Sequence, residues 1–131
     1  MRPLYYFADE PEFQRQRPWC WHPARGNLLV YGMPGSGTTT ALVTVGRALA
    51  QARGATYLDG DDFHPPENVA RMAAGQPLTD ADRQGWLSAL SERLAQARAN
   101  GEGVVLSCSA LKRAYRDVLR QGAPDLQLLH L

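Results

Sequence analysis

The chain has 131 residues and a formal net charge of +1, and 44% of its residues are hydrophobic. This length and composition predict one globular domain with a packed core. The small net charge gives no reason to expect a nucleic acid or an acidic membrane surface as a partner. The two cysteines cannot form a disulfide framework, and no stretch is long and apolar enough to cross a membrane. We therefore expect a reducing, cytoplasmic location.

Residues 1–26 differ from the rest of the chain. They contain a cluster of prolines and aromatic residues, and they follow neither a helical nor an alternating hydrophobic pattern. Termini of this kind are usually loose unless they are tied down. We expect a poorly ordered N-terminal extension. The alternative is an aromatic segment that docks on the core or on a partner.

A glycine-rich segment follows the first expected strand, 28–31, and opens a helix expected over 38–53. It consists of Gly32, Met33, Pro34, Gly35, Ser36, Gly37, Thr38 and Thr39. Backbone N–H groups and a helix N-terminus in such a turn form an anion site. The spacing matches the phosphate loop G-x-x-x-x-G-K-[ST], except that Thr38 stands at the lysine position. An ordinary strand–helix turn is the alternative, while the dinucleotide fingerprint fails because residue 40 is Thr.

Strands and helices are expected to alternate through the rest of the chain. The hydrophobic pattern, the glycine and proline stops and a capping box at 79–82 predict strands at 55–58, 103–107 and 126–131, and helices at 67–74, from 79 to about 100, and at 111–121. This order predicts an α/β fold with a mostly parallel sheet and flanking helices. Ligands collect at the carboxyl ends of the strands in such sheets. The segments at 32–39, 59–62 and 107–109 should therefore meet at one edge.

Three acids, Asp59, Asp61 and Asp62, follow the strand expected at 55–58. Alone they would be read as a solvated acidic turn. Opposite a phosphate loop, an acid can accept the proton of an attacking hydroxyl or hold magnesium. Asp61 is the best candidate for such a role. Asp59, at the strand end, either shares this role or is structural. His64 is expected either to contact the substrate or to satisfy a loop carbonyl.

Four basic residues, Arg71, Arg83, Lys112 and Arg116, are spread over the later helices. They are either solvated surface charges or recognise an anionic substrate, because the forked donors of arginine fit a carboxylate. Lys112 follows a strand-end loop and is the best placed of the four to face the site. Trp86 lies on an apolar helical face and is expected in the core.

Taken together, these motifs resemble those of the gluconokinase family in order and spacing. The resemblance covers about residues 27–131 and rests on residues 32–39, 59–65, 68, 71–72, 75–80, 82–83, 86–87, 108–112, 115–117 and 119–120. It implies a P-loop NTPase core related to the shikimate and adenylate kinases. It also implies transfer of the terminal phosphate of ATP to the 6-hydroxyl of D-gluconate, with Mg²⁺ as the metal.

The resemblance also implies roles for individual residues. Residues 32–39 become the ATP phosphate cradle, Thr39 and Asp61 the magnesium ligands, and Asp61 and Lys112 the catalytic residues. Candidates for the substrate pocket are His64, Arg71, Arg83 and Arg116. The implied partner is a small sugar acid, with neither nucleic acid nor membrane, and a homodimer is left open.

The sequence departs from the family pattern in three places. Thr38 replaces the lysine that bridges the β and γ phosphates, and Gly85 replaces a proline. The family continues beyond the last strand with a lid bearing arginines, an adenine-holding segment, and a further strand and helix. We therefore expect residues 27–131 to form an incomplete kinase domain with little or no activity on its own. The alternatives are a non-catalytic module that binds a nucleotide or a sugar acid, and an interaction or remnant protein.

Overall fold

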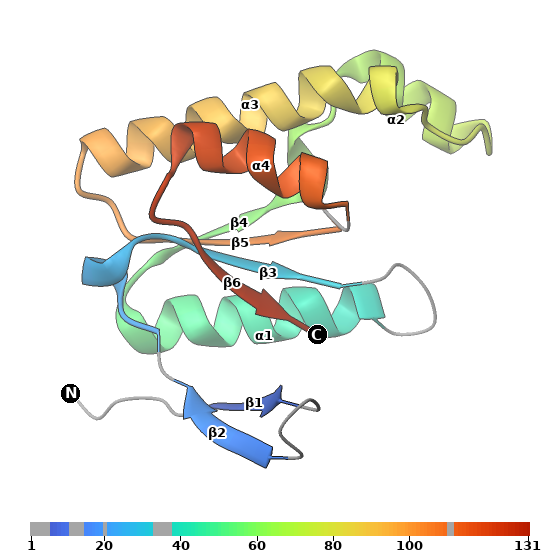
Figure 1. Ribbon diagram of the computed structural model, residues 1–131. Coiled ribbons are helices and arrows are strands. Elements are labelled where there is room, and N and C mark those ends of the chain that lie inside the picture. The colour runs from blue at the N-terminus through green and yellow to red at the C-terminus, as the bar shows by residue number, and fades with distance from the viewer. Residues whose placement is uncertain (1–5, 11–14, 20, 33–37, 110–111) are drawn as a thin grey trace.

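The computed structural model describes residues 6–10, 15–19, 21–32, 38–109 and 112–131 (Figure 1). For residues 6–10, 15–19 and 38–39 it describes the backbone alone. Most of the predicted phosphate loop therefore lies outside the described residues, namely Met33, Pro34, Gly35, Ser36 and Gly37, together with the side chains of Thr38 and Thr39.

The centre of the molecule is a sheet of four parallel strands. In spatial order these are β4 (Thr56–Asp59), β5 (Val104–Cys108), β3 (Leu28–Tyr31) and β6 (Gln127–His130). Every residue of β5 is buried, which explains its apolar run Val104–Leu106, since a strand covered on both faces needs no polar side, and the buried Ser107 hydroxyl donates to Leu42 O at 2.7 Å. The predicted α/β fold with a parallel sheet is confirmed.

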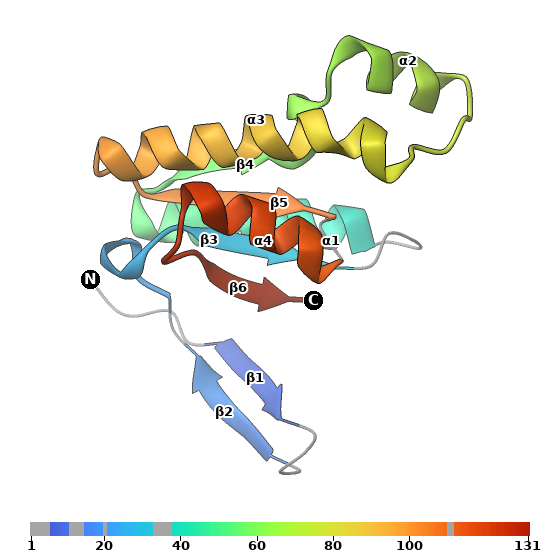
Figure 2. The ribbon, with the colours of Figure 1, turned by 45° about the horizontal axis from the view of Figure 1, so that its top comes forward.

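Helices cover both faces of this sheet (Figure 1). Helix α1 (Thr38–Arg53) lies on one face, and α3 (Asp80–Ala99) and α4 (Arg113–Gly122) lie together on the other. Helix α2 (Pro66–Ala73) projects beyond the carboxyl ends of the strands, as the rotated view also shows (Figure 2). The element order of the sequence thus produces three layers, with the sheet between two layers of helices.

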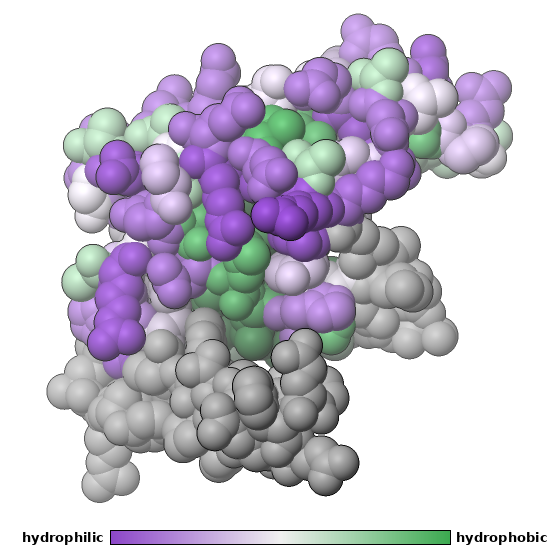
Figure 3. Space-filling view, viewed as in Figure 1, coloured by the Kyte–Doolittle hydropathy of each residue, from purple (hydrophilic) through white to green (hydrophobic). Residues whose placement is uncertain are grey.

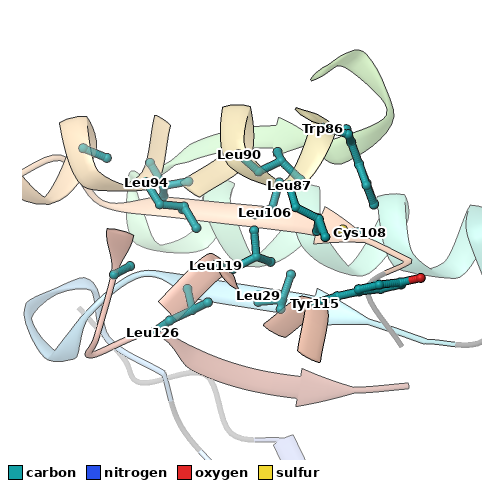
Figure 4. Packing of buried hydrophobic residues seen from close by; sticks show 13 residues of the cluster. Leu29, Trp86, Leu87, Leu90, Leu94, Leu106, Cys108, Tyr115, Leu119 and Leu126 are labelled. Carbon is teal, nitrogen blue, oxygen red and sulfur yellow. The ribbon is translucent and has the colours of Figure 1, made fainter. Parts of the chain in front are cut away.

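The core divides into two clusters because neighbouring strand residues point to opposite faces. Leu28 and Val30 pack toward α1, whereas Leu29 packs with side chains of α3 and α4. Figure 4 shows the second cluster, in which Leu87, Leu90 and Leu94 of α3 meet Leu106 of β5 and Leu119 of α4. Trp86 is 2% exposed in this cluster, so its predicted place in the core is confirmed.

One face of α1 differs from the prediction. Apolar residues at helical spacing, among them Ala41, Leu42, Ala48 and Leu49, predict its inner face. Leu42 and Leu49 are buried, but Ala41 and Ala48 are exposed, while Gly46 is buried. The helix approaches the sheet most closely at Gly46, where an added Cβ would clash with the Ser107 hydroxyl and lie 2.7 Å from Tyr57 Cε1. Counting apolar residues overlooked a glycine that makes this contact possible.

The predicted boundaries of α3 follow from its end residues. Asp82 N donates to Thr79 Oγ1 at 3.2 Å, and Thr79 N donates to Asp82 Oδ2 at 2.9 Å, so the capping box is present. Gly101 follows the helix with φ of +66°, a conformation that side chains with a Cβ seldom adopt. Both signals were visible in the sequence, and both are confirmed.

The N-terminal region contains two strands that the sequence pattern did not indicate. Strand β1 (Tyr6–Glu10) pairs in antiparallel fashion with β2 (Arg15–Trp19), and the two form a sheet of their own. A short turn, η2 (Pro23–Arg25), leads into β3. Trp21 is buried on the α1 side of the sheet, and its Nε1 donates to Gly26 O at 2.9 Å. The division of the chain at residue 26 stays a prediction.

The surface seen in Figure 3 is mainly polar over α2 and α3, with an apolar strip at the level of β6. Leu128 and Leu129 of that strand are partly buried. Within the part of the chain that the structure describes, no helix combines the length and the apolar character that crossing a membrane would require.

Candidate functional site

The acidic segment after β4 forms a short 3-10 turn, η3 (Gly60–Phe63). The Asp59 carboxylate accepts a hydrogen bond from Asp61 N at 3.0 Å and so caps this turn, the structural role that the sequence left open. The Gly60 carbonyl accepts a hydrogen bond from Trp86 Nε1 at 2.7 Å. A Cβ on Gly60 would lie 2.9 Å from Ser107 O, so only glycine fits here. These contacts fix Asp61 at the carboxyl edge of the sheet.

A cavity of about 180 Å³ opens beside Asp61. Two of the three segments that were predicted to meet contribute to its lining, through Asp59 and Asp61 after β4 and through Ser107, Cys108 and Ser109 at the end of β5, and the first turns of α1 add Leu42 and Val43. Most of the third segment, 32–39, lies outside the described residues. The hollow therefore lies between the strand ends and the start of the helix that the predicted phosphate loop opens. Its position is where a parallel α/β sheet binds ligands.

Negative charge is concentrated on this side of the cavity. Burial raises the pKa of Asp61 above its ordinary value, and the neighbouring Asp59 and Asp62 add to the rise. No basic side chain among the described residues forms an ion pair with Asp61. Carboxylate and hydroxyl oxygens are hard donors that suit Mg²⁺. The donor set therefore fits this metal.

The described residues supply only part of a magnesium shell. They contain no group of three or more histidine, cysteine or acidic side chains arranged to hold a metal ion. Mg²⁺ usually keeps several waters and is bound through one or two carboxylates and the phosphates of a substrate. One carboxylate such as Asp61 is thus sufficient from this side, and the side chain of Thr39 lies outside the described residues.

His64 follows the acidic turn and has a fixed ring. The imidazole stacks on Trp86, with ring centroids 4.5 Å apart and planes inclined by 14°. Burial lowers the pKa of His64 below its ordinary value, Asp61 acts in the opposite direction, and Arg83 adds to the lowering. His64 therefore lies within electrostatic reach of both the acidic cavity and Arg83.

A second cluster surrounds Asp80, the first residue of α3. Its carboxylate accepts hydrogen bonds from Lys112 Nζ at 3.0 and 3.1 Å and from the Tyr115 hydroxyl. Arg83 Nη1 lies 3.8 Å from Asp80 Oδ1 and donates to the Tyr115 hydroxyl at 3.3 Å. Two of the predicted basic residues, Lys112 and Arg83, are thereby brought together from two helices. Figure 4 shows the Tyr115 ring against the core and its hydroxyl at the outer end.

The contacts of this cluster shift the pKa values of its acidic and basic groups in opposite directions. Hydrogen bonds from Tyr115 and then Lys112 lower the pKa of Asp80, and the bond to Asp80 raises the pKa of Lys112. Sequence reasoning missed Asp80 and Tyr115 as members of a site. The spacing of Asp80 and Arg83, three residues apart on one helix, was a usable signal for the first. Nothing in the sequence marked the Tyr115 hydroxyl.

The other two predicted basic residues lie apart from the Asp80 cluster in the described contacts. Arg71 Nη1 donates to both oxygens of Asp82, at 2.7 and 2.8 Å, and so ties α2 to the start of α3. The Arg116 guanidinium lies 5.0 Å from the centroid of the Tyr31 ring, at the end of β3. The structure therefore divides the four predicted basic residues among three places.

Comparison with known proteins finds relatives in sequence and in structure. The chain is 46% identical to a probable gluconokinase of Rattus norvegicus over 101 residues, which are 77% of this chain and 52% of that protein. It is 44% identical to a gluconokinase of Gluconobacter oxydans over 104 residues, 79% of this chain and 56% of that protein. No protein-family model matches the chain.

Solved structures agree with these relatives. A gluconokinase from Sinorhizobium meliloti matches with a TM-score of 0.69 and 48% identity, covering 81% of this chain and 57% of that one. A sugar kinase from Janibacter matches with the same TM-score and 42% identity, covering 81% and 59%. The chain thus spans a little over half the length of the relatives it matches. In sequence and in fold, this chain is a homologue of gluconokinases over a little more than half of their length.

Proposed function

We propose that the chain carries a gluconokinase-type site that transfers the terminal phosphate of ATP to D-gluconate, with Mg²⁺ as the metal. The observation that carries the proposal is the acidic cavity at the carboxyl edge, between Asp61 and the first turns of α1. It occurs in a homologue of proteins named gluconokinases. A cytoplasmic location, where ATP is available, is part of the same proposal.

Asp61 is the residue that we assign to the proton. The attacking hydroxyl must lose a proton as it bonds to phosphorus, and a positioned carboxylate can accept it. The raised pKa of Asp61 makes its carboxylate a stronger base than an ordinary aspartate. Asp61 and Thr39 would also hold magnesium, which when bound neutralises charge on the phosphate oxygens.

The Asp80 cluster is the part of the site that we assign to the acid end of the substrate. Lys112 and Arg83 offer donors at one place, and their side chains are 59% and 35% exposed, so a second carboxylate can reach these donors from solvent. Arginine and lysine are the usual partners of a substrate carboxylate. His64 lies within electrostatic reach of Asp61 and of Arg83 in this cluster, whereas roles for Arg71 and Arg116 follow from the family resemblance alone.

Thr38 limits the rate that we expect. The lysine of a phosphate loop is a preorganised donor to charge that develops in the transition state. Loss of one such donor costs on the order of 3 kcal/mol, or roughly a hundredfold to a thousandfold in rate. The proposed activity of this chain is therefore slow, and a second candidate function is a module that binds ATP or gluconate without turnover.

Calorimetry with ATP and with gluconate, next to a coupled assay for 6-phosphogluconate, separates the two candidates. We expect both ligands to bind and the substitution Thr38→Lys to raise the rate roughly a hundredfold. Binding of both ligands without turnover, in the parent chain and in Thr38→Lys alike, would instead establish the binding module. If neither ATP nor gluconate binds, both candidates are contradicted.

A further inference from the structure

The side-chain amide of Asn68 can be oriented from its contacts. Asn68 lies on α2 and is only 4% exposed. Its Nδ2 lies 2.8 Å from the backbone carbonyl oxygen of Asp82. Because a carbonyl oxygen can only accept, the amide nitrogen and not the amide oxygen must face it. This contact removes the usual ambiguity of an asparagine side chain.

The orientation of Asn68 then determines the proton on His64. The same Nδ2 lies 3.4 Å from His64 Nδ1. Since an amide nitrogen offers only hydrogens, Nδ1 must be the acceptor. A neutral imidazole whose Nδ1 accepts carries its hydrogen on Nε2. The hydrogen-bonding pattern therefore selects one tautomer of His64.

The ring is fixed as well as its proton. The imidazole stacks on Trp86 at 4.5 Å, and Trp86 is itself held by the bond from its Nε1 to Gly60 O at 2.7 Å. Within the described part of the chain, no hydrogen bond to Nε2 of His64 is present. A donor with a fixed direction is thus available beside the acidic turn.

We propose that Asn68 is a positioning residue that holds His64 in the Nε2–H tautomer, so that His64 donates a hydrogen bond to a hydroxyl oxygen of a polyhydroxy acid. This assignment rests on the proposed function for the identity of the ligand. It makes His64 a donor rather than a proton acceptor, and it leaves Asp61 as the base. The lowered pKa of His64 is in keeping with a neutral ring.

Nitrogen NMR of the isotopically labelled full chain tests the tautomer directly. The chain has three histidines, and His22 supplies an internal reference, because its Nδ1 accepts from Ala24 N at 3.1 Å. We expect His64 Nδ1 to resonate as an unprotonated ring nitrogen and Nε2 as a protonated one. A protonated Nδ1 in the parent chain would overturn the proposal without any variant.

The substitution Asn68→Asp tests the cause. A carboxylate cannot donate to His64 Nδ1 and instead accepts a hydrogen from it, so we expect Nδ1 of His64 to become protonated while His22 is unchanged. An unchanged Nδ1 signal of His64 in folded Asn68→Asp would show that Asn68 does not set the tautomer. Should this variant fail to fold, the parent spectrum and the two variants below still decide.

Two substitutions of His64 itself test the donor. The amide nitrogen of glutamine reaches the place of Nε2, whereas that of asparagine reaches only the place of Nδ1. We expect His64→Gln to bind gluconate about tenfold more tightly than His64→Asn, the size of one net hydrogen bond. Equal affinities would refute the donor role. Absence of gluconate binding by the parent chain would refute the proposed function, while the NMR result would still stand by itself.

Discussion

The substitution Trp86→Phe removes one donor and leaves most of an aromatic ring. Trp86 is 2% exposed, and its Nε1 donates to Gly60 O at 2.7 Å. Gly60 is buried, so its carbonyl would lose this partner without gaining water. The same indole carries the stacked His64 ring, which phenylalanine can still support. The perturbation is therefore mainly the loss of one buried hydrogen bond in the turn that carries Asp61.

The expected size follows from two contributions. An unsatisfied buried carbonyl costs about 1–3 kcal/mol. The smaller ring leaves a void that costs about 1 kcal/mol more. We expect the free energy of unfolding to fall by about 2–4 kcal/mol. With a urea dependence of about 2 kcal/mol per molar, the unfolding midpoint followed by circular dichroism should fall by about 1–2 M.

Trp21→Phe is the matched control. Trp21 is also 2% exposed, and its Nε1 donates to Gly26 O at 2.9 Å, on the face of the sheet that α1 covers. Gly26 is half-buried, so its carbonyl can regain water, and we expect a smaller loss of stability than for Trp86→Phe. Gluconate affinity should not change in Trp21→Phe, whereas Trp86→Phe should lower both stability and gluconate affinity. A Trp86→Phe chain within about 0.5 kcal/mol of the parent would refute the reasoning, because no buried bond could then have been lost.

Three further predictions concern stability. Asp61→Asn should stabilise the chain at neutral pH without divalent cations, because the raised pKa of Asp61 means that the fold favours its neutral carboxyl, and this contribution to stability is lost as the pH rises through the folded-state pKa; urea titrations at several pH values should show that the higher unfolding free energy of the variant disappears in acid. Thr79→Ala should lower the unfolding free energy by about 1 kcal/mol through loss of the capping box, whereas Thr44→Ala, at an exposed position of α1, should leave it unchanged or raise it slightly, because alanine is the better helix former. Gly46→Ala should lower the thermal midpoint by overpacking against Ser107 and Tyr57, and Gly85→Ala should raise it, since its Cβ would lie 3.8 Å from the nearest atom, Pro65 Cγ; equal signs in calorimetry would contradict this.

The fold was largely predictable from local signals. Strand β3 and helix α1 have the predicted bounds, and the remaining elements differ at their ends by one or a few residues. Apolar runs, glycine stops and the Thr79 capping box all act within a few residues of chain, so a pattern along the sequence can show them. The hairpin of β1 and β2 was missed because that segment shows no alternation.

The site was predictable only in part, because its contacts join distant residues. The meeting of 59–62 with 107–109 follows from the rule that parallel strands share a carboxyl edge. The Asp80–Tyr115 and Trp86–Gly60 bonds join residues 35 and 26 positions apart, and they depend on how α3 packs. No spacing rule reaches across such packing. The same limit applies to Asn68: the family resemblance includes this residue, but its contacts with His64 and Asp82 appear only in the structure.

Phosphorus NMR of the chain with ATP, Mg²⁺ and gluconate tests the central claim most directly. We expect a phosphate-monoester signal of 6-phosphogluconate to grow together with ADP, slowly in the parent chain and faster in Thr38→Lys. Asp61→Asn in the Thr38→Lys background should slow this growth by roughly a hundredfold or more, whereas Asp62→Asn should change it only a few-fold. Equal rates in the Asp61 and Asp62 variants, or release of free phosphate without any phosphogluconate, would contradict the account.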